Sequence, residues 1–228
     1  MICSGRQSVI FFKLDSSHLE TVRAICAALE NHRNRKLRIT NDELRTAENE
    51  TDDFNFRFER NDAGEFFYEE KLGYKNRLFI VGGGHCALAL SELMSKMDFY
   101  IALFDDRETL NTLAKNRFVH EKNIIESYEK ISERIPEGGD VYVVVMTLGY
   151  KSDEIAIRRL IGKNFKYFGV LGSRAKMKTL LKNLEKEGFS KEKLNRIRAP
   201  VGLPINSRTP EEIAVSIAAE IIAVKNAA

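Results

Sequence analysis

The chain has 228 residues, of which 43% are hydrophobic and 30% charged, a composition typical of a soluble globular protein with one large domain or two modest ones. No apolar run reaches the roughly 18 residues needed to cross a bilayer, and Lys13 and Asp15 directly follow the apolar patch near the start, so we expect neither a membrane span nor a signal peptide. The three cysteines are widely spaced, without a Cys-x-x-Cys pair, which favours a reducing, cytoplasmic compartment.

Charge is distributed unevenly along the chain. The formal net charge is +3, but residues 151–200 hold fourteen Lys/Arg and five Asp/Glu, a local charge of +9. Such an excess can attract an anion, although a solvated, lysine-rich helix surface explains the same composition. The stretch lacks interleaved aromatics and any recognisable nucleic-acid-binding module, so we expect no nucleic-acid partner.

The first 75 residues are predicted to form a small α+β region. The apolar run Gln7–Asp15 predicts a strand. Apolar residues then recur at helical spacing over 16–33, where Ser17 and Glu20 are placed as a capping box. The start of the chain therefore predicts a strand followed by an amphipathic helix.

The remainder of this region predicts β-structure. Lys36–Thr40 is a candidate strand, and the polar, acidic stretch 41–53 is predicted to be a loop. Phenylalanines alternate with polar residues over 54–58, before a break at 61–64 after which apolar residues resume, and this pattern predicts a hairpin. With so few strands, the region looks incomplete as an independent fold.

Residues 76–228 are predicted to form an α/β domain with a Rossmann-like, doubly wound parallel sheet, because short apolar strands alternate with helices. VYVVVMT, at 141–147, is almost uniformly apolar and β-branched, as expected of a central buried strand. The predicted strands are 78–81, 100–104, 141–147 and 167–171, with a weak one near Phe118. The predicted helices are 84–97, 108–115, 127–134, 153–162, 174–187 and 210–225.

A glycine turn follows the first of these strands. Gly82, Gly84 and Ala87 fit the pattern G-x-G-x-x-G/A between a strand and a helix. The first glycine permits a tight turn, the second, with Gly83 beside it, lets backbone approach a phosphate, and the small third residue lets the helix pack on the strand. The helix start supplies free N–H groups for an anion. A tight turn with nothing bound is the alternative.

Acidic and reactive residues surround this turn. Asp105 lies twenty-three residues beyond Gly82 at the end of the next strand, with Asp106 after it, where a ribose-binding carboxylate is expected. A carboxylate there favours NAD over NADP, because it would repel a 2′-phosphate. His85 and Cys86 lie on the first turn of the helix, where the dipole favours neutral imidazole and thiolate. Capping and packing are the plain alternatives for both.

The loops after the later strands are predicted to complete the site, because ligands of doubly wound sheets bind beyond the carboxyl ends of the strands. Thr147 and Gly149 follow the fourth strand, and Ser152 or Asp153 is expected to cap the next helix.

After the fifth strand, Gly172, Ser173 and Arg174 combine backbone donors with a guanidinium, either as an anion site or as a plain helix cap, with Arg174 and Lys176 facing outward. The irregular, apolar stretch Ala199–Thr209 is predicted to drape across the site. It ends in a capping box formed by Thr209 and Glu212.

These motifs together closely resemble the carboxyl-terminal domain of the xanthine dehydrogenase accessory (XdhC/CoxI) family over about residues 77–225, roughly two-thirds of the chain. The resemblance is carried by GGGHCALAL, FDDR, VYVVVMT, YFGVLGSRAKMKTLLKNL, GFSKEKLNRIRAPVGLPI and RTPEEIAVSIAAEI. It implies a maturation factor that binds molybdenum cofactor, assists its sulfuration and hands it to the apo-enzyme of a molybdenum hydroxylase.

Two departures from the family pattern qualify that expectation. The stretch after Thr147 is Leu-Gly-Tyr, where the family has a histidine-bearing T-H-G-H-like segment, so any role of those histidines is absent. The amino-terminal region resembles only the later part of the family's amino-terminal domain, with Cys3-Ser4-Gly5 matching a Cys-Gly-Gly-like turn. Cofactor handling would then be lost, or shared across a homodimer.

The residues leave three functions open. A molybdenum-cofactor carrier and an NAD(P)-binding oxidoreductase would share the glycine turn, since both ligands are anionic. A dehydrogenase needs a proton donor or acceptor near the substrate, and only His85 and Asp153 are weak candidates, so delivery is favoured over catalysis. A nucleotide-binding scaffold rests on the same turn and the basic stretch. No metal-ligand cluster is predicted.

Overall fold

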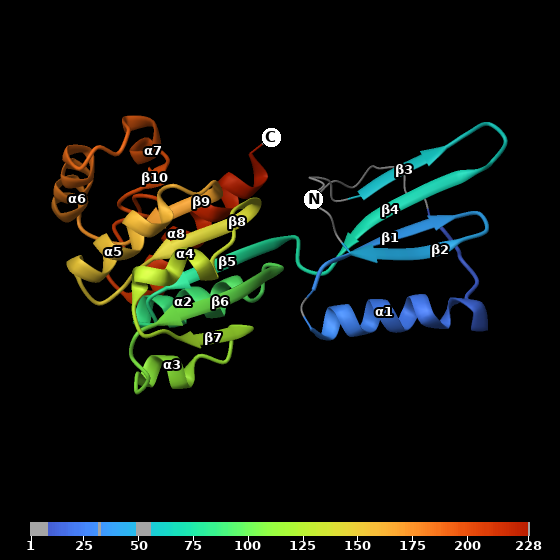
Figure 1. Ribbon diagram of the computed structural model, residues 1–228, viewed down its shortest axis with the longest axis horizontal. Coiled ribbons are helices and arrows are strands. Elements are labelled where there is room, and N and C mark those ends of the chain that lie inside the picture. Colours follow the sequence, from blue (N-terminus) through green and yellow to red (C-terminus); the bar gives the residue numbers. More distant parts are fainter. Residues whose placement is uncertain (1–8, 32, 49–55, 228) are drawn as a thin grey trace. The chain divides into compact units, whose positions relative to one another are not determined.

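The computed structural model describes residues 9–31, 33–48 and 56–227. The chain divides into two compact units, Met1–Tyr74 and Lys75–Ala228, each of which has its own sheet (Figure 1). Cys3–Gly5, Gln7 and Phe54, to which the sequence assigns a turn, the start of a strand and part of a hairpin, lie outside the described residues. Within the described part, every helix is too short or too polar to cross a bilayer.

The first unit is a four-stranded antiparallel sheet of order β2-β1-β4-β3 with one helix against it. Among its described residues, Ala28 and Glu69 are the buried ones. Arg38 approaches the Glu69 carboxylate at 2.8 Å, and Lys36 lies 3.9 Å from it. A buried carboxylate paired with cations, one of them exposed, therefore takes a place that an apolar side chain would usually fill. Its elements are η1 (Ser16–His18), α1 (Leu19–Glu30), β1 (Arg35–Thr40), β2 (Leu44–Glu48), β3 (Phe56–Arg60) and β4 (Phe66–Leu72).

Three predictions for this unit are wrong. Residues 9–15 form no strand. The first helical turn is capped by Asp15, which accepts from the Ser17 N–H at 2.9 Å, instead of by Ser17 and Glu20. The stretch predicted as loop contains β2, whose sequence LRTAE is too polar to stand out from a loop because it forms a solvated edge strand. The helix, the strand at 35–40 and the hairpin are confirmed.

The second unit is the predicted doubly wound fold. Its six strands are all parallel, in the order β10-β9-β8-β5-β6-β7. The strands are β5 (Asn76–Val81), β6 (Phe99–Asp105), β7 (Glu121–Ile124), β8 (Gly138–Val145), β9 (Phe165–Val170) and β10 (Ile197–Arg198). The helices are α2 (His85–Met94), α3 (Asn111–Lys115), η2 (Tyr128–Lys130), α4 (Ile131–Arg134), α5 (Tyr150–Leu160), α6 (Arg174–Lys186), α7 (Lys191–Asn195) and α8 (Pro210–Asn226).

Alternate residues of the buried strands feed two apolar cores, one on each face of this sheet. Phe79 and Val143 pack on one face with the side chains of α4, α5 and α6. Ile80 and Val144 pack on the other face with those of α2 and α8. Helices thus cover both faces, as Figure 1 shows, and the central strands are apolar on both sides, as a parallel sheet requires.

The boundaries in this unit differ from the prediction at a few places. The weak strand expected near Phe118 begins three residues later, as β7. α5 begins at Tyr150 instead of at 153. α7 and β10 are absent from the prediction because each is too short to show a period, and β10 pairs only through Ile197 and Arg198. The capping box of α8 is confirmed, since the Glu212 N–H donates to Thr209 at 3.2 Å and the Thr209 N–H donates to Glu212 at 3.2 Å.

Thr209→Ala is expected to lower the free energy of unfolding by about 1 kcal/mol, because the Glu212 N–H loses its acceptor at the start of α8. Chemical denaturation monitored by circular dichroism would measure the change. Thr179→Ala, in the exposed middle of α6, is the matched control and should be neutral, since alanine favours a helix interior. Equal losses in both variants would contradict the capping role.

Candidate functional site

The candidate site lies at the carboxyl edge of the parallel sheet. β5 and β8 are neighbours in the middle of this sheet, and the chain order runs outward from them in opposite directions. The loops that follow them, 82–84 and 146–149, therefore diverge at a topological switch point, where doubly wound folds place their ligands. The predicted glycine turn and the predicted Thr147–Gly149 loop are brought together there.

Gly82 lets these two loops approach closely. Its φ of +109° suits glycine alone, and a Cβ there would collide with the carbonyl group of Met146 and lie 2.8 Å from the Cα of Thr147. The Met146 N–H donates to the Val81 carbonyl at 2.7 Å, which holds the two loops in register. No side chain can occupy this position without moving one of the loops.

Gly84 and Gly149 open the site to a ligand. Each is the N-cap residue of a helix, α2 and α5 respectively, and neither helix has a side-chain cap among the described residues. Apart from the chain neighbours and the backbone of its own helix, no described heavy atom lies within 4 Å of where a Cβ would stand on either glycine. Two helices thus begin beside open space without a side-chain cap among the described residues, and helix starts of this kind attract anions.

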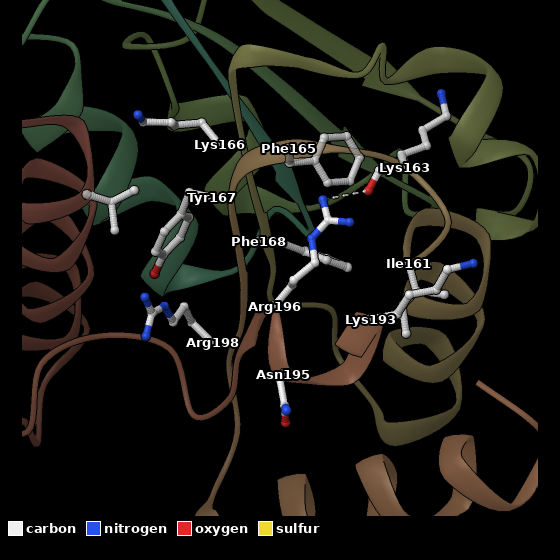
Figure 2. A pocket seen from close by; sticks show the side chains of 11 residues that line it. Ile161, Lys163, Phe165, Lys166, Tyr167, Phe168, Lys193, Asn195, Arg196 and Arg198 are labelled. Carbon is white, nitrogen blue, oxygen red and sulfur yellow. Dashed lines mark hydrogen bonds between the residues drawn. The ribbon is translucent and has the colours of Figure 1, made fainter. Parts of the chain in front are cut away.

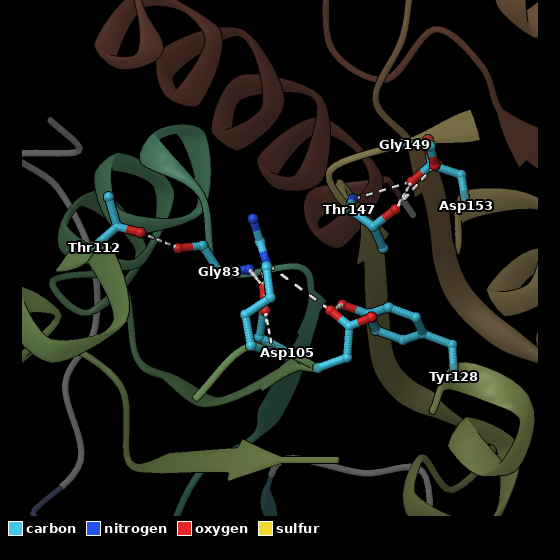
Figure 3. A network of polar contacts seen from close by, with 9 residues as sticks. Gly83, Asp105, Thr112, Tyr128, Thr147, Gly149 and Asp153 are labelled. Atoms are coloured by element: carbon cyan, nitrogen blue, oxygen red, sulfur yellow. Dashed lines mark hydrogen bonds and ion pairs between the residues drawn. The ribbon is translucent and has the colours of Figure 1, made fainter. Parts of the chain in front are cut away.

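Asp105 holds the glycine turn in place through a hydrogen bond to its backbone (Figure 3). Its fully buried carboxylate accepts from the Gly83 N–H at 2.6 Å and from the Arg107 guanidinium at 2.7 and 2.8 Å. Thr112 donates to the Gly83 carbonyl at 2.5 Å. Burial alone would raise the pKa of Asp105, but the hydrogen bonds from Arg107 and the Gly83 N–H outweigh it and lower the pKa below its usual value.

Asp106 lies at the surface beside this cluster. Its side chain is 37% exposed and accepts a hydrogen bond from the Tyr128 hydroxyl at 3.3 Å. Burial, followed by the charges of Asp105 and Asp106, raises the pKa of Tyr128, so the hydroxyl stays protonated and donates. Of the two acidic residues predicted to reach a ligand, Asp106 has the accessible carboxylate and Asp105 is fully engaged within the chain.

A second buried carboxylate fixes the loop after β8. Asp153, 1% exposed, accepts from the N–H and the hydroxyl of Thr147 at 3.0 and 2.6 Å. Its other oxygen pairs with the Lys176 ammonium at 2.7 Å. Figure 3 shows this cluster facing the Asp105 cluster across the switch point. The network ties β8, α5 and α6 together directly below the open Gly149.

The remaining predicted residues lie around this edge. His85 is exposed on the first turn of α2, and Ala87 is fully buried, which lets α2 pack on the sheet. Ser173 caps α6 by accepting from the Lys176 N–H at 3.3 Å, Gly172 packs against Met177, and Arg174 is exposed. Within the described residues, no group of three or more His, Cys, Asp or Glu is placed to hold a metal ion.

The model of the XdhC Rossmann domain family matches residues 78–221 of this chain. The chain belongs to the XdhC family. It is 34% identical over 157 residues to the uncharacterized protein YqeB of Escherichia coli K12, a match covering 68% of this chain and 28% of that protein. It is 30% identical over 154 residues to a probable xanthine dehydrogenase subunit of Bacillus subtilis 168, covering 67% of this chain and 44% of that protein. The chain therefore spans less than half the length of these two relatives.

A solved structure also resembles this XdhC chain. The crystal structure of a xanthine dehydrogenase from Bacillus halodurans aligns with a TM-score of 0.68 at 21% identity, covering 92% of this chain and 65% of that one. At this identity the likeness shows the fold alone. The sequence resemblance to the XdhC/CoxI family and the Rossmann-like fold class are both confirmed.

Two local expectations about this XdhC site are wrong. Ser152 and Asp153 do not cap α5, because the helix begins at Tyr150. Asp153 lies in its first turn, where its carboxylate accepts a hydrogen bond from Thr147. Lys176 does not face outward, because Asp153 holds its ammonium. For Cys86 the alternative of packing is favoured, because burial, and then the negative charge of Glu211, raise the pKa of its thiol.

The segment 199–209 connects the edge of the sheet to the start of α8. The Val201 N–H donates to the Val170 carbonyl at 2.9 Å, and the Leu203 N–H donates to the Ser216 carbonyl at 3.2 Å. Cys86 of α2 and Ile213 of α8 pack against the same apolar core. The irregular segment is thus held against β9 and α8, and its predicted place across the site stays a prediction.

Sequence reasoning missed Arg107 and Thr112, and it gave Asp153 and Lys176 other roles. The sequence contained a signal for the role of Arg107, since a cation two residues after a buried acid can fold back to pair with it. Thr112 and Lys176 had none, because they lie 29 residues from Gly83 and 23 residues from Asp153, respectively, and only the folded sheet brings those segments together.

Gly82→Ala is expected to destabilise the protein by at least about 3 kcal/mol, because a methyl group at positive φ would collide with backbone of the β8 loop. Urea denaturation would measure the loss. Gly84→Ala, at φ −69° in open space, is the control and should change the free energy of unfolding by no more than about 0.5 kcal/mol. A tolerated Gly82→Ala would contradict the contact.

Asp105→Asn is expected to lower the free energy of unfolding by roughly 2–4 kcal/mol at neutral pH, since the Arg107 guanidinium loses its charged partner. The pKa of Asp105 is lower when folded, so its stabilisation is complete above its unfolded pKa of about 3.9 and is lost as pH falls through the folded pKa. The variant should therefore lose less stability than wild type on acidification below pH of about 4.

Denaturation curves measured at intervals of roughly one pH unit across pH 2–7 would compare Asp105→Asn with wild type on both sides of the unfolded pKa. Glu126→Gln removes an exposed carboxylate nearby and should keep the wild-type profile. The same acid dependence in Asp105→Asn as in wild type would show that this carboxylate carries none of the stability.

Proposed function

We propose that this chain is a maturation factor for a molybdenum hydroxylase of the xanthine or carbon monoxide dehydrogenase type, which binds molybdenum cofactor transiently and delivers it to the apo-enzyme. The observation that carries the proposal is the open edge at Gly84 and Gly149, where two helices begin with no side-chain cap among the described residues. The cofactor is the cargo of this reaction and not a resident group.

The chemistry of the open edge suits such a cargo. Molybdopterin carries a phosphate, and the free N–H groups at the starts of α2 and α5 supply donors and partial positive charge for it. The absence of a Cβ on Gly84 lets an oxygen approach the backbone. The exposed Asp106 and His85, on either side of the turn, offer polar groups for the edge of a pterin ring.

The buried titratable groups favour delivery over catalysis. Asp105 and Asp153 are paired with Arg107 and Lys176, so neither carboxylate is poised to take a proton from a substrate. Burial raises the pKa of Tyr128 and of Cys86, which opposes a role for either as an anion. The edge is rigid and donor-rich, and this suits holding a ligand better than transforming it.

The names of the related proteins support the proposal independently of the geometry. The Bacillus subtilis relative is named a probable xanthine dehydrogenase subunit, and the Bacillus halodurans structure a xanthine dehydrogenase. This chain has the Rossmann domain of the family, so we propose that a molybdenum hydroxylase apo-enzyme is its partner. A homodimer is part of the proposal, since Phe56 and Phe58 are exposed on the edge strand β3 and a second copy could cover them.

A second candidate is an NAD-type dinucleotide, bound either by an oxidoreductase or by a scaffold. The glycine turn and the strand order favour it, as does the exposed Asp106, whose carboxylate can accept from a ribose hydroxyl. The two ligands would compete for the same helix start, so one experiment separates them.

Purified protein incubated anaerobically with molybdenum cofactor is expected to retain about one molybdenum per chain or per dimer after rapid removal of free ligand. Gly84→Asp should reduce retention at least about tenfold, because a carboxylate at the start of α2 repels the phosphate. Elemental analysis would measure retained molybdenum, with and without excess NAD.

Gly162→Asp is the matched control for this experiment. Gly162 is exposed in open space at the end of α5, at the opposite edge of the sheet, and the same substitution there should leave retention unchanged. Retention lost to excess NAD would place both ligands at one site. No retention by wild type would overturn the carrier proposal, and NAD binding on its own would favour the second candidate.

A further inference from the structure

A pocket lies at the other edge of the parallel sheet. It is a pocket of about 370 Å³ beside the amino-terminal half of β9, lined also by residues of the α7–β10 segment and by Val224 near the end of α8 (Figure 2). Because all strands of this sheet are parallel, the amino end of β9 lies opposite the edge that carries the glycine turn. Its volume is within the range of small-molecule sites.

The lining of this pocket is strongly basic. It contains five of the fourteen lysines and arginines of residues 151–200 and no carboxylate. They come from the turn before β9, from β9, from α7 and from the chain around β10, so they do not form one solvated helix face. Part of the basic excess seen in the sequence thus gathers around one hollow. The five are Lys163, Lys166, Lys193, Arg196 and Arg198.

Most of these cations are available to a ligand. Lys163 is the exception, since its ammonium donates to the carbonyls of Ser132 and Ile135. Arg196 donates one long bond of 3.5 Å to the Lys163 carbonyl, drawn in Figure 2, which leaves most of its guanidinium donors unused. Within the described residues, no carboxylate pairs with the other three cations, and all three are exposed. Those three are Lys166, Lys193 and Arg198.

Aromatic side chains form the apolar part of the wall. Phe165 and Phe168 pack edge to face with ring centres 5.6 Å apart. Tyr167 donates its hydroxyl to Glu220 at 2.6 Å, and burial followed by that carboxylate raises its pKa, so the ring stays neutral. Glu220 also accepts from the Gly202 N–H at 2.7 Å. The carboxylate behind the wall is therefore engaged within the fold.

We propose that this pocket binds a small phosphomonoester with a flat ring, of about the size of a mononucleotide. The Arg196 guanidinium, which lies beside Phe165 (Figure 2), binds the phosphate with its fork of donors, and Arg198, which lies beside Tyr167, adds positive charge to the pocket. Lys166 and Lys193 add positive charge at the rim, and Phe165 offers a ring face for stacking. This site is independent of the proposed delivery function, because it lies at the opposite edge of the sheet and shares no residue with the glycine turn.

Titration calorimetry of the full chain with AMP, adenosine and inorganic phosphate tests the proposal. AMP is expected to bind at least about tenfold more tightly than adenosine, because the phosphate makes the charge-assisted hydrogen bonds. It should also bind more tightly than inorganic phosphate, which has no ring. Arg196→Glu with Arg198→Glu should weaken AMP binding at least about tenfold.

Lys178→Glu with Lys182→Glu is the matched control, since this double variant makes the same charge change at exposed positions of α6 away from the pocket, and it should bind AMP as wild type does. Thermal melting checks that each variant folds, and Arg196→Gln replaces the double variant if that one does not. Undiminished AMP binding in the arginine variants, or no binding at about 5 mM AMP, overturns the proposal.

Gly84→Asp distinguishes the two edges. It should leave AMP binding unchanged if the pocket is the site. Loss of AMP binding in Gly84→Asp, with binding kept in the arginine variants, would place the phosphate at the glycine turn and overturn the pocket assignment. Neither result depends on whether the chain retains molybdenum.

Discussion

The close approach of two backbone segments at Gly82 organises the carboxyl edge of the parallel sheet. The Gly82 N–H donates to the Phe104 carbonyl at 2.7 Å, and the Met146 N–H donates to the Val81 carbonyl at 2.7 Å. Three neighbouring strands, β6, β5 and β8, are thereby joined at their ends around a residue with no side chain. The open side of the turn at Gly84 can face a ligand only because the opposite side is closed in this way.

Two buried carboxylates make that arrangement rigid. A carboxylate taken out of water is unfavourable by several kcal/mol unless it is paired and hydrogen-bonded. Asp105 meets this requirement with the Gly83 N–H and Arg107, and Asp153 meets it with Thr147 and Lys176. Each pairing joins a loop of the site to a cation that is about 30% exposed. Moving either loop would break a buried charge pair, so the donors at Gly84 and Gly149 are held in place before any ligand arrives.

The sequence predicted what depends on local pattern and missed what depends on contacts across the fold. The alternation of apolar strands and helices indicated the sheet, and the G-x-G-x-x-A spacing indicated the turn at Gly82. The polar edge strand β2 and the two-residue β10 have no pattern that separates them from loops. The role of Asp153 was missed for a related reason. Lys176, whose ammonium pairs with its carboxylate, lies far away in the sequence.

The two edges of the sheet present positive charge by different physical means. At the carboxyl edge, Arg107 and Lys176 are neutralised by buried carboxylates, so attraction for an anion comes from backbone N–H groups at helix starts. At the amino edge, attraction comes from side chains such as Arg198, which lie in solvent without a paired carboxylate in the described chain.

Exposed side-chain charges are screened strongly by salt, whereas donors fixed in a turn act at contact distance and are screened less. Attraction for an anion at the first edge therefore depends less on salt concentration than attraction at the second.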